Sequence, residues 1–305
     1  MGSVPAAAAD VWMLVRENPV PLMKATQALA EALEAAHGPR FAVWHTDELL
    51  FGVRRGRLVL RTLGGLEVAP PKVVLVRQTP GTMAQDREVS LLRHLEHLGA
   101  VLINSASAHI RCGNKLWQLQ DLAAAGLPVP DTLSYATAPL TGVVRSPDVV
   151  APCIVKAVRG RNGREVFLAP DTGLLRSVAG SLAQDVPLVF QEYVSASHGR
   201  DLRVVVVDGE PVAAQIRTAR DGSLAANLAQ GGAAELCLGR FPDAEALAVA
   251  AAGTLGLTLA GVDLLFTADG GHTICEVNAV PGWRPRMTSV IPAVTAYVAR
   301  LLAER

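Results

Sequence analysis

Apolar residues recur along the first third of this chain at two spacings, which predict short strands separated by helices. Runs of three to five apolar residues predict strands at residues 11–15, 41–44, 73–76 and 101–103. Apolar residues at helical spacing predict helices near residues 22–36 and 89–98. Strands that alternate with helices are typical of a mostly parallel α/β sheet. Because RENPVP rather than GxGxxG follows the first strand, this sheet is not predicted to bind a dinucleotide.

The pattern changes after a helix predicted over residues 114–125, which ends at the stop signal Gly126-Leu127-Pro128. β-Branched segments with glycine-containing turns between them predict an antiparallel sheet from residues 153–169, 188–194, 202–207 and 211–217. The last third alternates again, with helices predicted at 243–254 and near 291–302 and strands at 260–267 and 273–277. The uncharged run 247–262 is shorter than a membrane span, so we expect a buried helix followed by a strand.

Composition and charge narrow the class of protein. The 305 residues are 50% hydrophobic and 18% charged, which indicates a globular protein of two domains or of coupled lobes. Its 28 basic and 28 acidic residues balance, so a nucleic-acid partner is not expected. The start of the chain lacks the layout of a secretion signal and no segment is long enough to span a membrane, so we expect a cytoplasmic protein. The four scattered cysteines predict neither a zinc site nor disulfides.

Residues 153–168 predict a hairpin whose connecting turn reads RGRNGR. Gly160 and Gly163 make this turn flexible, and the backbone N–H groups of such a turn can lie against phosphates. Lys156, on the strand before the turn, adds a cation that phosphate oxygens can share. An ordinary hairpin with a solvated basic tip fits the same pattern, so this stretch alone leaves both readings open.

Polar side chains interrupt two neighbouring apolar strands near the end of the chain. Asp263 lies in GVDLLF, and Glu276 and Asn278 lie in TICEVN, which the loop 269–272 joins. We expect a hairpin with Asp263 opposite Asn278, diagonal to Glu276, and all three on one face. Converging carboxylates need a cation between them, and oxygen ligands suit Mg²⁺ held jointly with nucleotide phosphates. The alternative is an edge pair whose polar residues face water.

A third stretch, the strand 188–194 followed by SASHGRD, ends at Asp201. Main-chain carbonyls around residues 192–194 could accept the amino group of an adenine, and Asp201 could take ribose hydroxyls. HGRDL also resembles the catalytic loop of a protein kinase. Val206 stands where that motif has Asn, and no DFG follows, so a kinase is not predicted.

In this order, the pieces resemble the ATP-grasp superfamily, and specifically its RimK-like branch of glutamate ligases, over nearly the whole chain. The stretches that carry the resemblance are LLRHLEHLG, GNKLWQLQDLAAAGLPVPDTLSY, VKAVRGRNGREVFLA, VSASHGRDLRVVVV and GVDLLF…CEVNA. They are most similar to the N-acetylaspartylglutamate and β-citrylglutamate synthases. The resemblance implies an α/β (α+β) fold whose antiparallel sheets clamp a nucleotide. It divides the chain into an N-terminal α/β domain over residues 1–108, a central ATP-grasp lobe over 109–190 and a C-terminal lobe with the metal site over 191–305.

The same resemblance assigns roles to single residues. Those expected to bind ATP are Lys115, Lys156, Arg161, Asn162, Gly163, Glu192, Tyr193, Val194, Asp201 and Asn227. Those expected to bind Mg²⁺, with two ions expected and Mn²⁺ as a substitute, are Asp263, Glu276 and Asn278. Arg217, in QIRTARDG, is expected to act with Lys156 in catalysis next to the reacting phosphoryl group. Asn227, which matches the motif asparagine, is also expected to contact substrate. Separately from the resemblance, Arg77, Arg284 and Arg16 are candidates for binding substrate carboxylates through two hydrogen bonds, and for each the alternative is a surface position.

The implied activity is an ATP-dependent ligase. A carboxylate is a poor electrophile, so the acceptor first attacks the γ-phosphate to give an acyl phosphate, which the amine of an amino acid then converts to an amide. L-Glutamate is the expected amine, and a small acid or a cofactor tail is the expected acceptor. The flap 160–163 would exclude water from the intermediate. The alternatives are glutamylation of a protein or peptide C-terminus and a non-catalytic ATP sensor; a homo-oligomer stays open.

Two departures from the family pattern concern the substrate. Ala225-Ala226-Asn227 replaces the Arg-Ser-Asn of members that modify a ribosomal protein. Val280-Pro-Gly-Trp-Arg284 is absent from the N-acetylaspartylglutamate type and is similar to bacterial members, some of which glutamylate cofactor tails such as those of tetrahydromethanopterin-like carriers. Trp283 either walls an acceptor pocket or packs this turn. The sequence therefore leaves the acceptor open.

Overall fold

The computed structural model describes residues 8–16, 23–77, 86–159, 166–181, 187–220, 222–224 and 232–304. Its helices are α1 (Lys24–His37), α2 (Asp86–His97), α3 (Ala106–Cys112), α4 (Lys115–Ala124), α5 (Leu140–Val143), α6 (Thr172–Ser181), α7 (Pro242–Thr254) and α8 (Val290–Ala303). Its strands are β1 (Val11–Val15), β2 (Phe41–His45), β3 (Leu49–Arg54), β4 (Arg57–Thr62), β5 (Val73–Val76), β6 (Val101–Ile103), β7 (Thr132–Ser134), β8 (Cys153–Ala157), β9 (Val166–Ala169), β10 (Leu188–Glu192), β11 (Arg200–Val207), β12 (Glu210–Thr218), β13 (Ala233–Leu236), β14 (Leu259–Phe266) and β15 (His272–Asn278).

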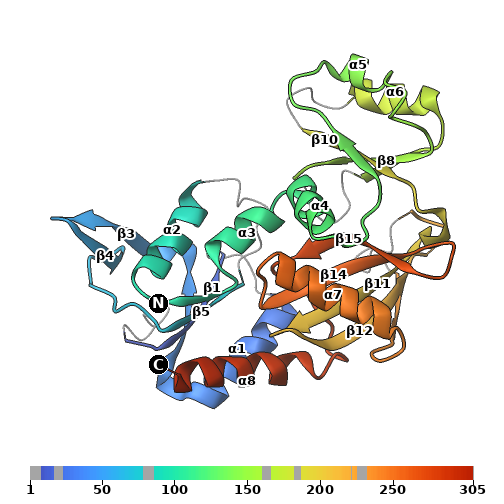
Figure 1. The fold of residues 1–305 in the computed structure, drawn as a ribbon. Coiled ribbons are helices and arrows are strands. Elements are labelled where there is room, and N and C mark those ends of the chain that lie inside the picture. Colours follow the sequence, from blue (N-terminus) through green and yellow to red (C-terminus); the bar gives the residue numbers. More distant parts are fainter. Residues whose placement is uncertain are drawn as a thin grey trace.

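The N-terminal region is the parallel α/β sheet that the sequence predicts. Its strands lie in the order β2-β1-β5-β6, and every neighbouring pair is parallel. Alternate side chains of β1 enter different cores: Trp12 and Leu14 pack towards α2, whereas Met13 packs with residues of α1 and α8. The chain therefore returns to its start, since α8 lies along α1 (Figure 1). No described helix is long and apolar enough to cross a membrane.

The hairpin β3–β4 was not predicted from the sequence. It turns at Arg55 and Gly56, both of which have positive φ, as a two-residue hairpin turn requires. Leu49 and Leu60 are buried in the N-terminal core and Phe51 packs against it, whereas Leu50 and Val53 are exposed. The hairpin projects from the N-terminal region at the left of Figure 1.

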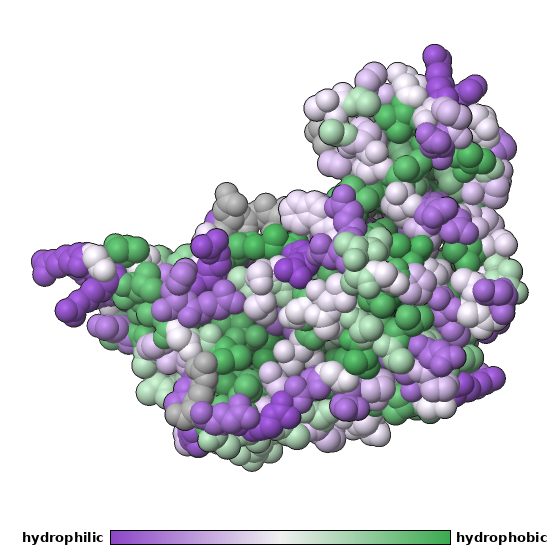
Figure 2. All heavy atoms as spheres, in the orientation of Figure 1, coloured by the Kyte–Doolittle hydropathy of each residue, from purple (hydrophilic) through white to green (hydrophobic). Residues whose placement is uncertain are grey.

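The strands predicted as an antiparallel sheet between residues 153 and 217 are antiparallel, but they divide between two sheets. One sheet has the order β7-β10-β8-β9, and the other has the order β13-β12-β11-β14-β15. The division falls at the 3₁₀ turn Ser195–Ser197, between β10 and β11. The lobe of β8, β10, α5 and α6 stands clear of the N-terminal region, and the surface between them is concave (Figure 2). The predicted domain boundaries at residues 108 and 190 stay predictions.

The five-stranded sheet is covered on both faces, because the side chains of its strands alternate between two cores. On β11, Leu202, Val204 and Val206 pack with the alanines of α7. Val205 and Val207 point the other way and pack with the N-terminal sheet and α8. We call this second face the inner face. Because side chains alternate along a strand, Leu259, Asp263 and Leu265 of β14 also lie on the inner face.

The register of the hairpin β14–β15 differs from the prediction. Asp263 lies opposite Glu276, whereas Asn278 lies opposite Gly261 and is therefore diagonal to Asp263. The loop spans residues 267–271, and β15 carries one extra residue, Cys275, as a β-bulge. These two features shift the predicted pairing by two positions. A shift of two keeps Asp263, Glu276 and Asn278 on one face, so that part of the prediction is confirmed.

One buried amide joins the N-terminal sheet to the five-stranded sheet. Asn104, which follows β6, donates from Nδ2 to the carbonyl oxygens of Leu259 and Ala279, both at 2.7 Å. Its Oδ1 accepts from the backbone N–H groups of Thr258 and Leu259, at 2.8 and 3.0 Å. The amide thus satisfies four backbone groups next to the start of β14 and the end of β15.

Replacing this amide tests how far it stabilises the junction. Asn104→Ala would leave those backbone groups buried without partners, so we expect the free energy of unfolding to fall by about 3 kcal/mol or more. Urea unfolding measures the change. Gln27→Ala, which removes an exposed bond to Glu31, is the control and should change stability by less than about 0.5 kcal/mol. An Asn104→Ala protein as stable as this control would contradict the assignment.

Candidate active site

Charged side chains gather at one end of the inner face of the five-stranded sheet. Asp201 and Arg203 of β11 share this face with Val205, because side chains alternate along a strand. Arg203 pairs in register with Asp263 of β14, and Asp201 pairs with Arg217 of β12. Three strands therefore bring alternating charges together where the apolar part of the face ends.

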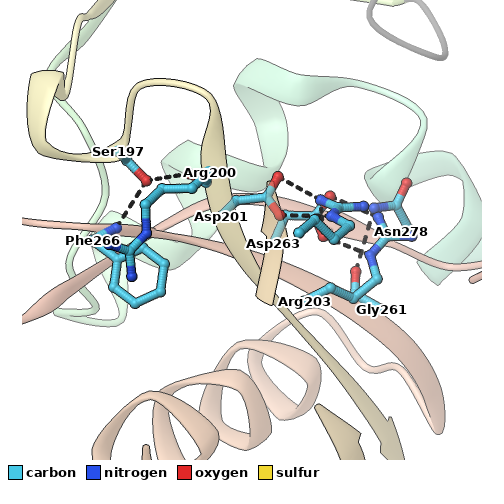
Figure 3. Close-up of polar contacts among 9 residues, drawn as sticks. Ser197, Arg200, Asp201, Arg203, Gly261, Asp263, Phe266 and Asn278 are labelled. Atoms are coloured by element: carbon cyan, nitrogen blue, oxygen red, sulfur yellow. Dashed lines mark hydrogen bonds and ion pairs between the residues drawn. The ribbon is translucent and has the colours of Figure 1, made fainter. Parts of the chain in front are cut away.

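These side chains form a continuous ion-pair network. Arg203 donates from Nε to Asp263 Oδ1 and from Nη2 to Oδ2, each at 2.6 Å (Figure 3). Arg217 donates from Nε and Nη2 to the two oxygens of Asp201, at 2.6 and 2.7 Å. Nη2 of Arg217 also lies 3.0 Å from Asp263 Oδ1. The order of charges is Arg203, Asp263, Arg217, Asp201, and each side chain keeps only 13–16% of its surface exposed.

Burial and neighbouring charges act in opposite directions on these carboxyl groups. Burial alone would raise the pKa of Asp263, but Arg203 and Arg217 hold that pKa below its usual value. Burial raises the pKa of Asp201, because it outweighs the attraction of Arg217. The pKa of Arg217 is raised by its two acidic partners despite its burial. Asp263 is therefore the firmly ionised carboxylate of the network.

The three predicted metal ligands lie beside this network. Glu276 is the register partner of Asp263, and its Oε1 lies 3.6 Å from Lys115 Nζ. Asn278, one pleat further along β15, donates from Nδ2 to the carbonyl oxygen of Gly261 at 3.3 Å. Two carboxylates and an amide on one face fit Mg²⁺, which takes oxygen ligands and shares them with phosphates. The described residues hold no group of three His, Cys, Asp or Glu placed to bind a metal by themselves, so this metal site stays a prediction.

Lys115, at the start of α4, contacts the site through Glu276, and Lys156 lies on β8 of the four-stranded sheet. Lys156 is 4% exposed, and its Nζ donates to Gln191 Oε1 at 2.8 Å. Gln191 in turn donates from Nε2 to Thr132 Oγ1 at 2.9 Å. The backbone N–H of Lys115 donates to the carbonyl oxygen of Val158, which ties the start of α4 to the end of β8. A buried ammonium held by a neutral amide is suited to receive an anion.

A pocket of about 270 Å³ lies between the end of β10 and the loop of the β14–β15 hairpin. Tyr193 donates or accepts a 2.6 Å hydrogen bond with His198 Nδ1, which fixes the ring at the side of the pocket. The residues that line it are Glu192, Tyr193, Val194, Ser195, Ala196, Thr267, Ala268 and Thr273. The predicted adenine-binding residues therefore do line one cavity, whereas the predicted ribose ligand, Asp201, lies in the ion-pair network.

The predicted substrate arginines are not brought to one place. Arg77 is buried after β5, where its Nη2 donates to Pro281 O at 3.0 Å and its guanidinium carbon lies 4.7 Å from the centre of the Trp283 ring. Arg284 is exposed, and Arg16, after β1, is half-buried. The remaining predicted residues lie outside the described part of the chain: Arg161, Asn162, Gly163 and Asn227.

Sequence reasoning missed Arg203 and Gln191. The signal for Arg203 was present, because a charge two positions after Asp201 in the apolar strand DLRVVVV must share its face. Gln191 carried no such signal, since its role depends on β8 lying beside β10, which brings Lys156 within hydrogen-bond distance.

The central ion pair gives a test of the network. Arg203→Met leaves Asp263 with one guanidinium partner, so we expect the free energy of unfolding to fall by about 3 kcal/mol. Adding Asp263→Leu to this variant should recover much of the loss, because no uncompensated charge remains. Urea unfolding of both single variants and the double variant measures the coupling. The matched control is Arg240→Met in the exposed pair with Glu235, where we expect about 0.5 kcal/mol or less; purely additive losses would contradict the coupling.

Comparison with known proteins places this geometry in a family. Residues 112–299, more than half of the chain, match the RimK-like ATP-grasp domain. The chain is 36% identical to β-citrylglutamate synthase B of Homo sapiens over 285 residues, which cover 91% of this chain and 73% of that protein. It is 34% identical to N-acetylaspartylglutamate synthase A of Mus musculus over 281 residues, which cover 90% and 73%.

A bacterial protein and two solved structures extend this comparison. The chain is 38% identical to a probable α-L-glutamate ligase of Enterobacter sp. (strain 638) over 201 residues, 63% of each chain. The structure of the D-cycloserine synthetase DcsG matches with a TM-score of 0.71 and 23% identity over 97% of this chain and 99% of that one. The ATP-grasp ligase PsnB in complex with a minimal precursor matches with a TM-score of 0.70 and 24% identity, over 96% and 99%. The solved structures establish the fold. The domain match and the relatives above show that the chain belongs to the RimK-like ATP-grasp family of ATP-dependent amide-forming ligases.

Proposed function

We propose that this enzyme joins the amino group of L-glutamate to a carboxylate of a small acid, with ATP as the source of energy. The observation that carries the proposal is the inner-face site, in which Arg203, Arg217 and Lys115 adjoin the oxygen ligands proposed for Mg²⁺. Glutamate and a small acid are supported by the names of the relatives, which synthesise β-citrylglutamate and N-acetylaspartylglutamate.

Phosphoryl transfer explains the cations of this site. The acceptor carboxylate attacks the γ-phosphorus of ATP, the bond to ADP breaks, and an acyl phosphate forms; the amine of glutamate then displaces phosphate. Guanidinium groups that bind carboxylates through two hydrogen bonds bind phosphate in the same manner. Arg217 and Arg203 would therefore exchange part of their contact with Asp201 and Asp263 for phosphoryl oxygens. Lys156, held by Gln191, would add a fixed positive charge in a dry environment.

The residues that would hold Mg²⁺ are Asp263, Glu276 and Asn278. When bound, the ion neutralises charge on the phosphate oxygens. We propose two ions, with Mn²⁺ able to replace them. The nucleotide would be clamped between the four-stranded and the five-stranded sheet, with the central lobe over residues 109–190 and the C-terminal lobe over 191–305. Its adenine would enter the pocket at residues 192–194, and Asp201 would meet the ribose.

The acceptor is proposed to be a free acid or the acidic tail of a cofactor rather than a protein terminus. Balanced total charge supports a ligand held by a few side chains, and Arg284 at the end of Val280-Pro-Gly-Trp-Arg284 is exposed and able to meet it. Asn227 is the other residue we assign to the substrate.

The reaction is tested by its requirement for both substrates. We expect phosphate release from ATP only when L-glutamate and an acceptor are both present, because the acyl phosphate is made and consumed on the enzyme. Citrate, N-acetyl-L-aspartate and a cell extract are the acceptors to try, with isotopic glutamate and mass spectrometry of the products. A product mass identifies the acceptor and the number of glutamates added. No release with any acceptor and any amino acid would overturn the proposal.

Single substitutions test the site. Arg217→Lys and Asp263→Asn should each lower kcat about 10²-fold or more. Lysine keeps the charge but cannot make the two parallel N–H contacts of a guanidinium to phosphoryl oxygens. The Asp263→Asn change takes away the negative charge of a proposed metal ligand. Steady-state phosphate release measures the change, and circular dichroism checks the fold. Arg240→Lys, on the exposed surface, is the matched control and should leave kcat unchanged. Near-normal turnover of Asp263→Asn would mean that the metal site lies elsewhere.

A further inference from the structure

Arg77 is a buried cation for which the described residues supply no anionic partner. The side chain is 3% exposed and lies at the carboxyl end of β5. Its Nη2 donates to Pro281 O at 3.0 Å and to Thr26 Oγ1 at 3.4 Å, both neutral groups. Nε and Nη1 are buried and have no hydrogen-bond partner in the described part of the chain. A buried guanidinium is costly unless hydrogen-bond partners or an anion replace its lost hydration.

His109 of α3 is the second unpaired group at this place. The side chain is fully buried, and neither Nδ1 nor Nε2 has a partner among the described residues. Burial and the positive charge of Arg77 lower the pKa of His109 to about 4, so the imidazole is neutral at pH 7. Burial lowers the pKa of Arg77 to about 10, which keeps the guanidinium charged. The pair therefore offers one positive charge and one neutral N–H donor.

We propose that Arg77 and His109 form a subsite for one carboxylate of a substrate, with Trp283 covering the guanidinium. A singly charged, planar anion matches one guanidinium and one neutral imidazole. A doubly charged phosphate would leave excess negative charge in a dry site. The inference deepens the proposed function and rests on it for the identity of the acid.

The position of this pair supports a role in the same reaction. Pro281, which accepts from Arg77, follows the predicted metal ligand Asn278 by three residues, a span of at most about 11 Å. His109 lies on α3, the helix before α4, whose first residue, Lys115, lies 3.6 Å from Glu276. A Cβ added at Gly261 would meet Pro281 Cβ at 2.8 Å and Arg203 Cζ at 3.9 Å, so the segment that Arg77 contacts adjoins the ion-pair network. A diacid that binds at Arg77 would therefore direct its other carboxylate towards that network. The carboxyl end of a parallel sheet is also the edge at which α/β sheets bind ligands.

The carboxylate has two sources, the amino acid and the acceptor, and the experiment separates them. Binding of L-glutamate, citrate and N-acetyl-L-aspartate is measured by calorimetry on the whole chain in the presence of Mg²⁺ and a non-hydrolysable ATP analogue. The variants are Arg77→Met and His109→Leu, which remove the charge and the N–H donor. The matched controls are His94→Leu, at a buried histidine paired with Val59 O, and Arg111→Met on α3, which pairs with Asp121.

We expect both test variants to weaken binding of the same acid at least about tenfold, while affinity for the ATP analogue and both controls stay within about twofold. Weaker binding of L-glutamate would show that the subsite takes a carboxylate of the amino acid. Weaker binding of citrate or N-acetyl-L-aspartate would show that it takes one of the acceptor. Arg77→Lys keeps the charge and should bind that acid more tightly than Arg77→Met does. It also tests the subsite if Arg77→Met does not fold.

Two results would overturn the subsite. One is unchanged affinity for every acid in Arg77→Met and His109→Leu, which would leave Arg77 only a structural contact to Pro281. The other is a wild-type protein that binds none of the acids. Failure of the proposed ligation is distinct, because there an acid would bind through Arg77 while no amide mass appears.

Discussion

The alternation of side chains along a sheet with two buried faces is the constraint on which the site depends. Because α7 covers one face and the N-terminal sheet covers the other, each strand must be apolar in both directions over most of its length. Charged residues are tolerated on the inner face only where it extends beyond the N-terminal sheet and α8, which pack on the rest of it. Asp201, Arg203 and Asp263 occupy that end on neighbouring strands, so the packing that forms the core also fixes the geometry of the charges.

Within the network, each carboxylate is held by a guanidinium, and this has a consequence for ligand binding. Ion pairs of this kind cost desolvation, which their mutual attraction and hydrogen bonds offset. The guanidinium groups are therefore already desolvated and oriented before any nucleotide arrives. Under the proposed function, the guanidinium groups would not have to lose water or reorient when phosphate oxygens bind. Electrostatic stabilisation is most effective under that condition.

The junction between the N-terminal region and the five-stranded sheet lies at the start of β14 and the end of β15. Asn104 and Arg77 follow neighbouring parallel strands and both bind backbone groups just beyond β15. A structural contact and a proposed ligand contact thus lie side by side. The two differ in their hydrogen bonding. Both polar atoms of the Asn104 amide have partners, whereas Arg77 and His109 have nitrogens without a hydrogen-bond partner among the described residues. That difference is why we assign a substrate role to the second pair and not to the amide.

Local periodicity in the sequence was sufficient to predict where several elements lie, since each depends on residues close together in the chain. These elements are the four parallel strands, α4, α7, α8 and the hairpin β14–β15. It also put Asp263, Glu276 and Asn278 on one face, because a register shift of two preserves faces. Only the tertiary structure decided the register itself, which the loop 267–271 and the bulge at Cys275 set. Three further features were tertiary: the division of the middle strands between two sheets, the partnership of Arg203 with Asp263, and the contacts of Arg77 with Pro281 and Trp283. Each joins residues far apart in the chain, and no local pattern encodes their pairing.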